Sequence, residues 1–179
     1  MFDYAYSRDV QNRIAELVDI DFDKIPDDAN EEAVAENVSG ADVILSTWKG
    51  IPYSEKILAS CENLELIVYG AGSFKGYITE PLMKLNPTVC TAVHLNAIPT
   101  AEYTLALILV SLKDVFKFHD QLSEKHRSGW DRGAFTFTGG YYRTQVGILG
   151  YGLVSRHLMR LLSNFDMEVL IADDYVTPE

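Results

Sequence analysis

Cysteine is scarce in this sequence, which has only Cys61 and Cys90 among its 179 residues. A secreted domain that is held together by disulfides needs a larger set, so a disulfide scaffold is excluded. Both cysteines lie among apolar residues along the chain. We therefore expect two buried thiols, kept reduced in the cytoplasm.

Positive charge is also in short supply, because 15 Lys and Arg face 26 Asp and Glu, for a net charge of −11. A negative field of this size repels nucleic acid and anionic lipid, so we expect no nucleic acid and no membrane as partners. Long hydrophobic runs are missing as well, since the longest, Leu105–Val110 with its flanks, is too short to span a bilayer. The opening residues MFDYAYSRDV lack the basic and apolar regions of a signal peptide. A soluble, cytoplasmic protein is expected.

The N-terminal half alternates between strand-like and helix-like patterns. Apolar or β-branched runs predict strands, and an apolar residue at every third or fourth position predicts a helix. The predicted strands are Val43–Thr47, Leu64–Gly70 and Thr88–Val93, and the predicted helices are Arg8–Val18, Asp28–Val38, Pro52–Ser60 and Pro81–Leu85. Val43–Thr47 has the pattern of a strand buried on both faces. This alternation indicates parallel βαβ units and an α/β fold.

The pattern then changes and restarts. Pro99–His119 predicts one long helix that is apolar nearly all round, as in helices buried between layers or domains. His126–Tyr142 is rich in Gly, Arg and aromatic residues and is expected to be a loop. Beyond it, a strand at Gln145–Leu149, a helix at Val154–Phe165 and a strand at Glu168–Ala172 are predicted.

The segment GILGYGLVSR, Gly147–Arg156, connects this strand to this helix. Gly150 permits a tight turn, and Gly152 lets the backbone approach a pyrophosphate at the helix N-terminus. Ser155 stands where a third glycine is usual, and its small side chain should preserve close packing. The residues predicted to bind the pyrophosphate are Gly150, Tyr151, Gly152, Leu153 and Val154.

Asp173 ends the next strand, about 20 residues further on, as expected for a dinucleotide site. A carboxylate there accepts hydrogen bonds from the adenosine ribose and repels a 2′-phosphate, which favours NAD over NADP. The adjacent Asp174 is an alternative for the same contact. The simpler interpretation is an ordinary βαβ turn with a solvated acid.

Three segments in order resemble the D-isomer-specific 2-hydroxyacid dehydrogenase family. They are VYGAGSFKGYI at Val68–Ile78, NAIPTAEYTLALIL at Asn96–Leu109, and VGILGYGLVS at Val146–Ser155 followed by Asp173. The resemblance implies a flavodoxin-like parallel substrate domain at 1–99, an interdomain helix at 100–119, and the first βαβ unit of a Rossmann NAD-binding domain at 120–179. In such proteins the active site lies in the cleft between two α/β domains.

The resemblance also implies the site. The substrate, a small 2-hydroxy or 2-keto acid, would be held through its carboxylate by backbone N–H groups of Gly70, Ala71 and Gly72. Thr100 would line the nicotinamide. The alternative for Gly70, Ala71 and Gly72 is a plain turn at the end of a strand. The alternative for Thr100 is a helix cap. Asn96 and Glu102 match family positions for which structural roles are expected.

The sequence departs from the family just after the glycine turn, where an acid is usual and Ser73, Phe74 and Lys75 stand instead. Lys75 either directs positive charge to an acidic substrate or is a surface lysine, and the latter is favoured. Trp48 either forms a wall of the substrate pocket or belongs to the core.

The family's catalytic arginine, histidine and acid have no match here and are expected beyond Glu179, so no catalytic residue is assigned. The histidines His94, His119, His126 and His157 are expected to be surface or packing residues.

We expect a fragment of an NAD-dependent dehydrogenase that is inactive by itself, binds no metal and forms a homodimer. Phe2–Tyr6 would stand in for the strand that usually opens the substrate domain. The alternatives are a non-catalytic nucleotide- or partner-binding remnant, and an FMN-binding flavodoxin-like protein that leaves GYGLVS and Asp173 unexplained.

Overall fold

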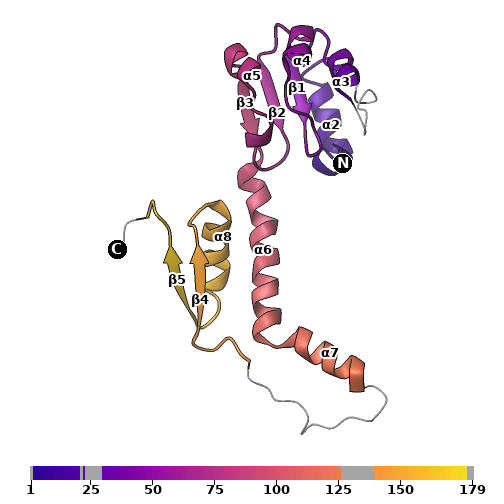
Figure 1. Cartoon of the computed structure of the whole chain (residues 1–179). Helices are drawn as coiled ribbons and strands as arrows, with labels where there is room; N and C mark the ends of the chain where they lie inside the picture. Colours follow the sequence, from indigo (N-terminus) through magenta and orange to yellow (C-terminus); the bar gives the residue numbers. More distant parts are fainter. Residues whose placement is uncertain (1, 21, 23–29, 126–138, 177–179) are drawn as a thin grey trace. The chain divides into compact units, whose positions relative to one another are not determined.

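The computed structural model describes residues 2–20, 22, 30–125 and 139–176. The chain divides into two compact units, residues 1–96 and 97–179 (Figure 1). Residues 126–138, which form most of the expected loop, and part of the predicted helix Asp28–Val38 lie outside the described residues. Each unit is described by itself.

The first unit contains a parallel sheet of three strands: β1 (Val43–Ser46), β2 (Leu66–Tyr69) and β3 (Thr88–Thr91). Their order is β1-β2-β3, with Val43 opposite Leu66 and Leu66 opposite Thr88. No residue of β1 is exposed. The parallel strands and intervening helices confirm the predicted α/β class.

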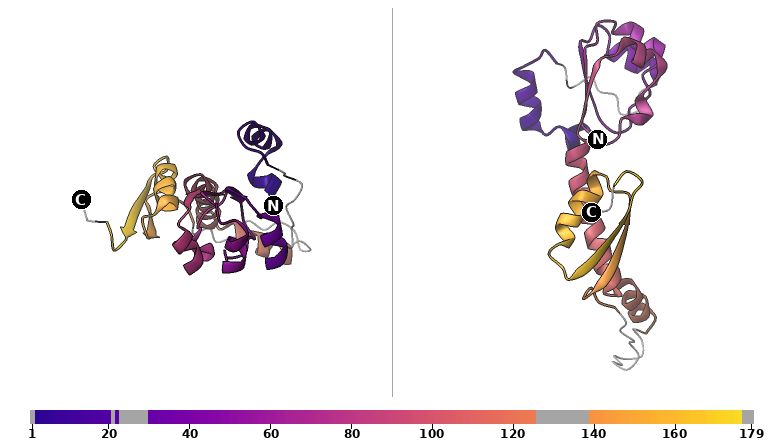
Figure 2. Two further views of the ribbon diagram at one scale, coloured as in Figure 1. Left: turned by 90° about the horizontal axis from the view of Figure 1, so that it is seen from above. Right: turned by 90° about the vertical axis from the view of Figure 1, so that its left-hand side faces the viewer.

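Helices cover both sides of this sheet (Figure 2, right). Three lie on one face: α3 (Glu31–Asn37), α4 (Glu55–Ser60) and α5 (Glu80–Leu85). Helix α2 (Arg8–Ala15) lies on the other. The side chains of Asn30, Ser54 and Thr79 accept hydrogen bonds from backbone N–H groups in the first turns of α3, α4 and α5, respectively. These N-caps explain where the three helices begin.

The start of the chain differs from the sequence-based expectation. Phe2–Ala5 forms helix α1 and not a stand-in for a strand. The following residue, Tyr6, is buried, and its hydroxyl lies within hydrogen-bond distance of the carbonyl oxygens of Ser46 and Val68, at 3.1 and 3.2 Å. This segment is therefore fixed to the sheet by a side chain and not by strand pairing.

The two cysteines also differ from each other. Cys61 is buried and burial raises its pKa, as expected for a core thiol. Cys90 is exposed, so the prediction that it is buried is wrong. Cys90 belongs to β3, the last strand of the sheet, in which all four residues are exposed.

The second unit begins within helix α6 (Val93–Leu112), which starts before Pro99 and includes it. The predicted single helix ends at Leu112, because Asp114 adopts the left-handed conformation with φ of 54° and separates α6 from α7 (Val115–Lys125). A βαβ unit follows, formed by β4 (Thr144–Leu149), α8 (Leu153–Leu162) and β5 (Met167–Ala172). Strands β4 and β5 are parallel.

The core of this unit lies on one face of the β4–β5 sheet, where α6 and α8 meet it. Ala101, Ile148, Leu158 and Leu162 are buried there, with Leu105 and Ile108 packed against them. On the other face the apolar side chains of Leu149 and Leu170 are 89% and 50% exposed. Within the described residues, this sheet is therefore covered on one side only.

Helix α6, with 20 residues, is long and apolar enough to cross a membrane by length and composition, with a mean hydropathy of 1.4 over an 18-residue window. The apolar run Leu105–Val110 is only part of this helix, so the run alone does not reveal its apolar length. Core helices of soluble proteins share these properties, and Ala101, Leu105 and Ile108 of α6 do pack in the second core. The absence of a membrane partner stays a prediction.

Candidate functional site

The glycine turn between β4 and α8 has the backbone that a dinucleotide site requires. Gly150 has φ of +87°, a conformation that favours glycine. Gly152 is the N-cap of α8, and a Cβ added there would meet no atom within 4 Å. The helix N-terminus therefore lies beside open space that a phosphate could approach.

Asp173 contacts this turn directly. Its Oδ2 accepts a hydrogen bond from the backbone N–H of Tyr151 at 2.6 Å, and its Oδ1 accepts one from the N–H of Tyr175 at 2.8 Å. These two N–H groups hold the pKa of Asp173 below its usual range, and Arg156 adds a smaller Coulombic effect in the same direction. The carboxylate is therefore ionised at neutral pH.

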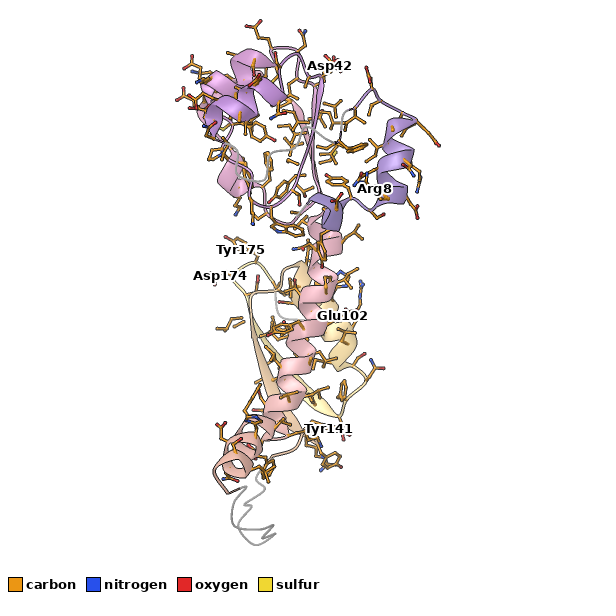
Figure 3. The ribbon with its side chains drawn as sticks, turned by 90° about the vertical axis from the view of Figure 1, so that its right-hand side faces the viewer. Arg8, Asp42, Glu102, Tyr141, Asp174 and Tyr175 are labelled. Atoms are coloured by element: carbon orange, nitrogen blue, oxygen red, sulfur yellow. The ribbon has the colours of Figure 1, made fainter. Side chains whose placement is uncertain are left out.

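The neighbouring acid lies differently. Asp174 is exposed and, like Tyr175, belongs to the segment after β5 (Figure 3). Of the two acids at the end of β5, Asp173 is the one whose carboxylate bonds to the turn. The sequence left this choice open, because the side-chain directions of two consecutive residues after a strand depend on the local backbone.

Ser155, at the third-glycine position, also contacts the turn. Its hydroxyl donates to the carbonyl oxygen of Gly150 at 2.7 Å. Next to it, the guanidinium of Arg156 lies over the ring of Tyr151, 5.3 Å from its centroid. Ser155 was expected only to preserve packing, so sequence reasoning missed its hydrogen bond.

The glycine turn after β2 lies in the first unit. The N–H of Gly70 donates to Ser46 O at 2.9 Å, and that of Ala71 donates to Tyr69 O at 2.8 Å. Of the three predicted substrate-binding residues, only Gly72 has an N–H without a partner in the described part of the chain. The proposed role of Gly70 and Ala71 would require their N–H groups to be shared with a ligand.

Two side chains pack closely on the glycines of this turn. A Cβ on Gly70 would lie 2.8 Å from the hydroxyl oxygen of Tyr6, and one on Gly72 would lie 2.9 Å from Nδ2 of Asn96. Tyr6 was not predicted to belong to the site, and no local signal could have found it, because its contacts with the sheet join residues far apart in sequence. Close approach by these side chains accounts for both glycines.

The remaining predicted residues are distributed along the two units. Trp48 is half-buried against the first core, and its ring centroid lies 6.3 Å from that of Tyr4. Lys75 is exposed. Thr100 lies well inside α6, so it is not a helix cap, and its carbonyl accepts the hydroxyl of Thr104. Glu102 also lies inside α6, on its exposed side (Figure 3).

The three histidines that the structure describes do not gather at either turn. His94 and His119 are exposed and His157 is half-buried in α8, whereas His126 lies outside the described residues. Within the described ranges, no group of three or more His, Cys, Asp or Glu could hold a metal ion. No acid/base group is therefore assigned from these side chains.

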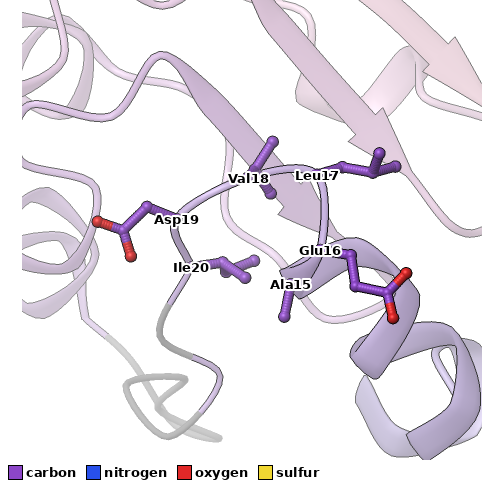
Figure 4. A pocket seen from close by; sticks show the side chains of 6 residues that line it. All are labelled: Ala15, Glu16, Leu17, Val18, Asp19 and Ile20. Carbon is purple, nitrogen blue, oxygen red and sulfur yellow. The ribbon is translucent and has the colours of Figure 1, made fainter.

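A hollow at the end of α2 is unrelated to these turns. It has a volume of about 430 Å³ and is lined by the six consecutive residues Ala15–Ile20 at the end of α2 (Figure 4). None of the site residues predicted from the sequence lines it. A hollow along one short segment does not bring together groups from different elements, so we do not assign the site to it.

Comparisons with known proteins identify the second unit. Residues 105–179 match the family D-isomer specific 2-hydroxyacid dehydrogenase, NAD binding domain. Over residues 105–179 this match confirms the family resemblance seen in the sequence, and the matched family is one of NAD-binding domains. A search of curated proteins gave no match.

Several solved structures share the fold. One, described as a D-isomer specific 2-hydroxyacid dehydrogenase, NAD-binding, from Polaromonas sp. JS6 66, has a TM-score of 0.75 and 15% identity, over 97% of this chain and 54% of that one. NAD+-bound 3-phosphoglycerate dehydrogenase from Entamoeba histolytica has a TM-score of 0.65 and 17% identity, over 97% and 52%. An acyclic imino acid reductase in complex with NADPH and D-Arg has a TM-score of 0.70 and 18% identity, over 94% and 53%. This chain spans about half the length of each.

Proposed function

Because residues 105–179 belong to the NAD-binding domain family of the D-isomer specific 2-hydroxyacid dehydrogenases, we propose that this chain is part of an NAD-dependent oxidoreductase. Its reaction is hydride transfer between nicotinamide and a small 2-hydroxy or 2-keto acid. Residues 1–99 form the substrate domain and 120–179 part of the NAD-binding domain, and the segment 100–119, which includes most of α6 and the start of α7, connects them. The observation that supports this most is the turn from Gly150 to Val154 with Asp173 bonded to it, inside the matched residues.

The turn fits NAD in shape and charge. The N–H groups at the start of α8 and the open space at Gly152 suit a pyrophosphate. The ionised carboxylate of Asp173 suits ribose hydroxyls and repels a 2′-phosphate. We propose that the turn formed by Gly150, Tyr151, Gly152, Leu153 and Val154 holds the pyrophosphate, that Asp173 holds the adenosine ribose, and that Thr100 lines the nicotinamide. The N–H groups of Gly150 and Tyr151 are already bonded to Ala172 O and to Asp173, so the donors to the pyrophosphate would be those at the start of α8. NAD supplies the hydride chemistry, and the chain binds and orients it.

The substrate is assigned to the turn after β2. We propose that the substrate carboxylate bonds to backbone N–H groups of Gly70, Ala71 and Gly72, with Gly72 as the principal donor. Of these three residues, Gly72 is the one whose N–H has no partner in the described part of the chain. The Asn96 amide next to Gly72 adds a polar group to the same place.

The reaction also needs an acid/base and a carboxylate clamp, which we assign to no residue of this chain. A polypeptide of these 179 residues should therefore bind NAD without oxidising NADH in the presence of a 2-keto acid. We further propose that it is cytoplasmic and a homodimer, with no nucleic acid or membrane partner.

The test is a calorimetric titration of the 179-residue chain with NAD, NADP and FMN, and an assay of NADH oxidation with pyruvate. We expect NAD to bind more tightly than NADP, no FMN binding and no turnover. Tighter binding of FMN would favour a flavodoxin-like protein and contradict the proposal. NADH oxidation by the purified chain would show that the acid/base group had been missed.

A further inference from the structure

Two hydrogen bonds in the nucleotide turn end on the same peptide group. The carbonyl of Gly150 accepts the Ser155 hydroxyl at 2.7 Å, and the N–H of Tyr151 donates to Asp173 at 2.6 Å. This carbonyl and this N–H are the two polar ends of the peptide that joins Gly150 to Tyr151. Both ends of one peptide are therefore held by side chains from two different elements, α8 and the end of β5.

We propose that Ser155 and Asp173 are positioning residues that clamp the Gly150–Tyr151 peptide and hold the nucleotide turn in its binding conformation before the cofactor arrives. This inference rests on the proposed function, since it concerns the same turn. It assigns Ser155 a role that a glycine at that position could not have. It also assigns Asp173 a second role besides contact with the ribose.

The clamp acts where the backbone has the most freedom. Gly150 has φ of +87°, and a glycine has wide freedom in both φ and ψ, so rotation about its ψ could turn the following peptide over. Rotation of the peptide would break both hydrogen bonds at once. The N–H of Gly150 is also bonded, to Ala172 O at 2.8 Å, so the strand ladder holds the residue just before the clamp.

The carboxylate that forms one arm of the clamp is itself fixed. Its second oxygen accepts the N–H of Tyr175 at 2.8 Å, so Asp173 cannot swing away without losing this bond as well. The guanidinium of Arg156 lies over the Tyr151 ring at 5.3 Å, which restrains the side chain of the clamped residue. An ordered turn loses less conformational entropy on binding, so the clamp should strengthen cofactor binding.

The experiment compares Ser155→Ala and Ser155→Gly with Ser155→Thr, which keeps a hydroxyl. Ser163→Ala is the matched control, because the Ser163 hydroxyl makes the same kind of bond, to Arg160 O at 2.8 Å, at the other end of α8. Hydrogen exchange of the Tyr151 amide is measured by NMR in the 179-residue chain without cofactor. NAD affinity is measured by calorimetry and thermal stability by circular dichroism.

We expect Ser155→Ala and Ser155→Gly to speed exchange at Tyr151 and to weaken NAD binding by about 3- to 10-fold, the value of one hydrogen bond. Ser155→Thr should keep the exchange rate at Tyr151 and the NAD affinity of the unmutated chain. Ser163→Ala should leave both quantities unchanged, although it should lower thermal stability as much as Ser155→Ala does. A purely structural serine would lower stability without changing exchange at Tyr151 or NAD affinity.

The outcomes separate this inference from the proposed function. If the unmutated chain binds NAD and Ser155→Ala binds it equally well, the clamp is overturned and the function stands. If the unmutated chain binds no NAD, the proposed function fails, and unchanged exchange at Tyr151 in Ser155→Ala would overturn the clamp as well.

Discussion

At the scale of single residues, the site depends on which backbone groups are already bonded. The N–H of Tyr151 donates a hydrogen bond to Asp173. The N–H groups of Gly70 and Ala71 donate to carbonyl oxygens of the sheet. The sequence identifies the glycines and the acid, because their spacing follows from a strand, a tight turn and a helix start. It cannot show which N–H groups stay available, because that depends on contacts between residues far apart in sequence, such as that of the Gly70 N–H with Ser46 O.

Replacement of Asp173 by Ala should narrow the preference for NAD over NADP. The variant loses the acceptor for ribose hydroxyls and no longer repels a 2′-phosphate, so the ratio of the two affinities should fall about 10-fold or more. Calorimetry on the 179-residue chain measures both affinities. Asp174→Ala is the control and should leave the ratio unchanged. Preference of the unmutated chain for NADP would show that the ribose assignment is wrong.

The clamp at Tyr151 should survive mild acid. Bonding to the N–H groups of Tyr151 and Tyr175 lowers the pKa of Asp173 in the folded chain. A lowered pKa contributes stability that is complete above the unfolded value and is lost as the pH falls through the folded value. The Tyr151 amide resonance should therefore shift with a midpoint below the ordinary pKa of an aspartate. Asp173→Asn should abolish this midpoint, and a midpoint at or above the ordinary value would contradict the bonding.

Bulk at Gly72 should impair substrate binding and not cofactor binding. The Cβ of a new side chain would lie 2.9 Å from Asn96 Nδ2, so the turn or Asn96 must move. In a form of the protein that turns over a 2-keto acid, Gly72→Val should raise KM several-fold or abolish turnover, with NAD affinity nearly unchanged. Gly76→Val is the control, because a Cβ there meets no atom within 4 Å. An unchanged KM would show that the turn is only structural.

At the scale of elements, local patterns predicted most helices and strands to within a few residues, because apolar periodicity and caps act over short distances. Long-range and backbone effects account for the misses. The apolar pattern continues past Leu112, but the left-handed Asp114 ends α6 there. Pro99 suggested a helix start, yet the helix begins at Val93 and includes the proline. Helix α1 replaces an expected strand because buried Tyr6 anchors the segment.

The anchoring of α1 by Tyr6 can be tested by removing one hydroxyl. Tyr6→Phe keeps the buried ring and leaves the carbonyl oxygens of Ser46 and Val68 without this donor. The free energy of unfolding should fall by about 1 kcal/mol, measured by urea titration of the 179-residue chain. Tyr4→Phe is the matched control, since Tyr4 is 82% exposed and should have almost no effect. Equal stabilities of the two variants would contradict the anchoring.

At the scale of the whole molecule, each unit has its own core, but the second core covers only one face of its sheet. In the described residues, β4 and β5 form a two-stranded sheet, and each pairs only with the other. An unpaired apolar edge beside an exposed apolar face favours association with another chain. The two parallel strands were predicted from the sequence, whereas the exposure of particular side chains comes only from the structure.

We therefore expect the 179-residue chain to associate through the second unit. Each 100 Å² of apolar surface that becomes buried contributes about 2.5 kcal/mol, so pairing of the exposed sheets in a dimer should outweigh the entropy of association at micromolar concentration. Sedimentation equilibrium should show a dimer, and Leu170→Lys should shift it toward monomer, because Leu170 is 50% exposed and the lysine places a charge on the open face of the sheet. Leu17→Lys, at an 83% exposed position in the first unit, is the control and should leave the dimer intact. A monomer in which the amides of 145–172 are all protected from exchange would contradict this expectation, because it would mean that the open sheet needs no partner.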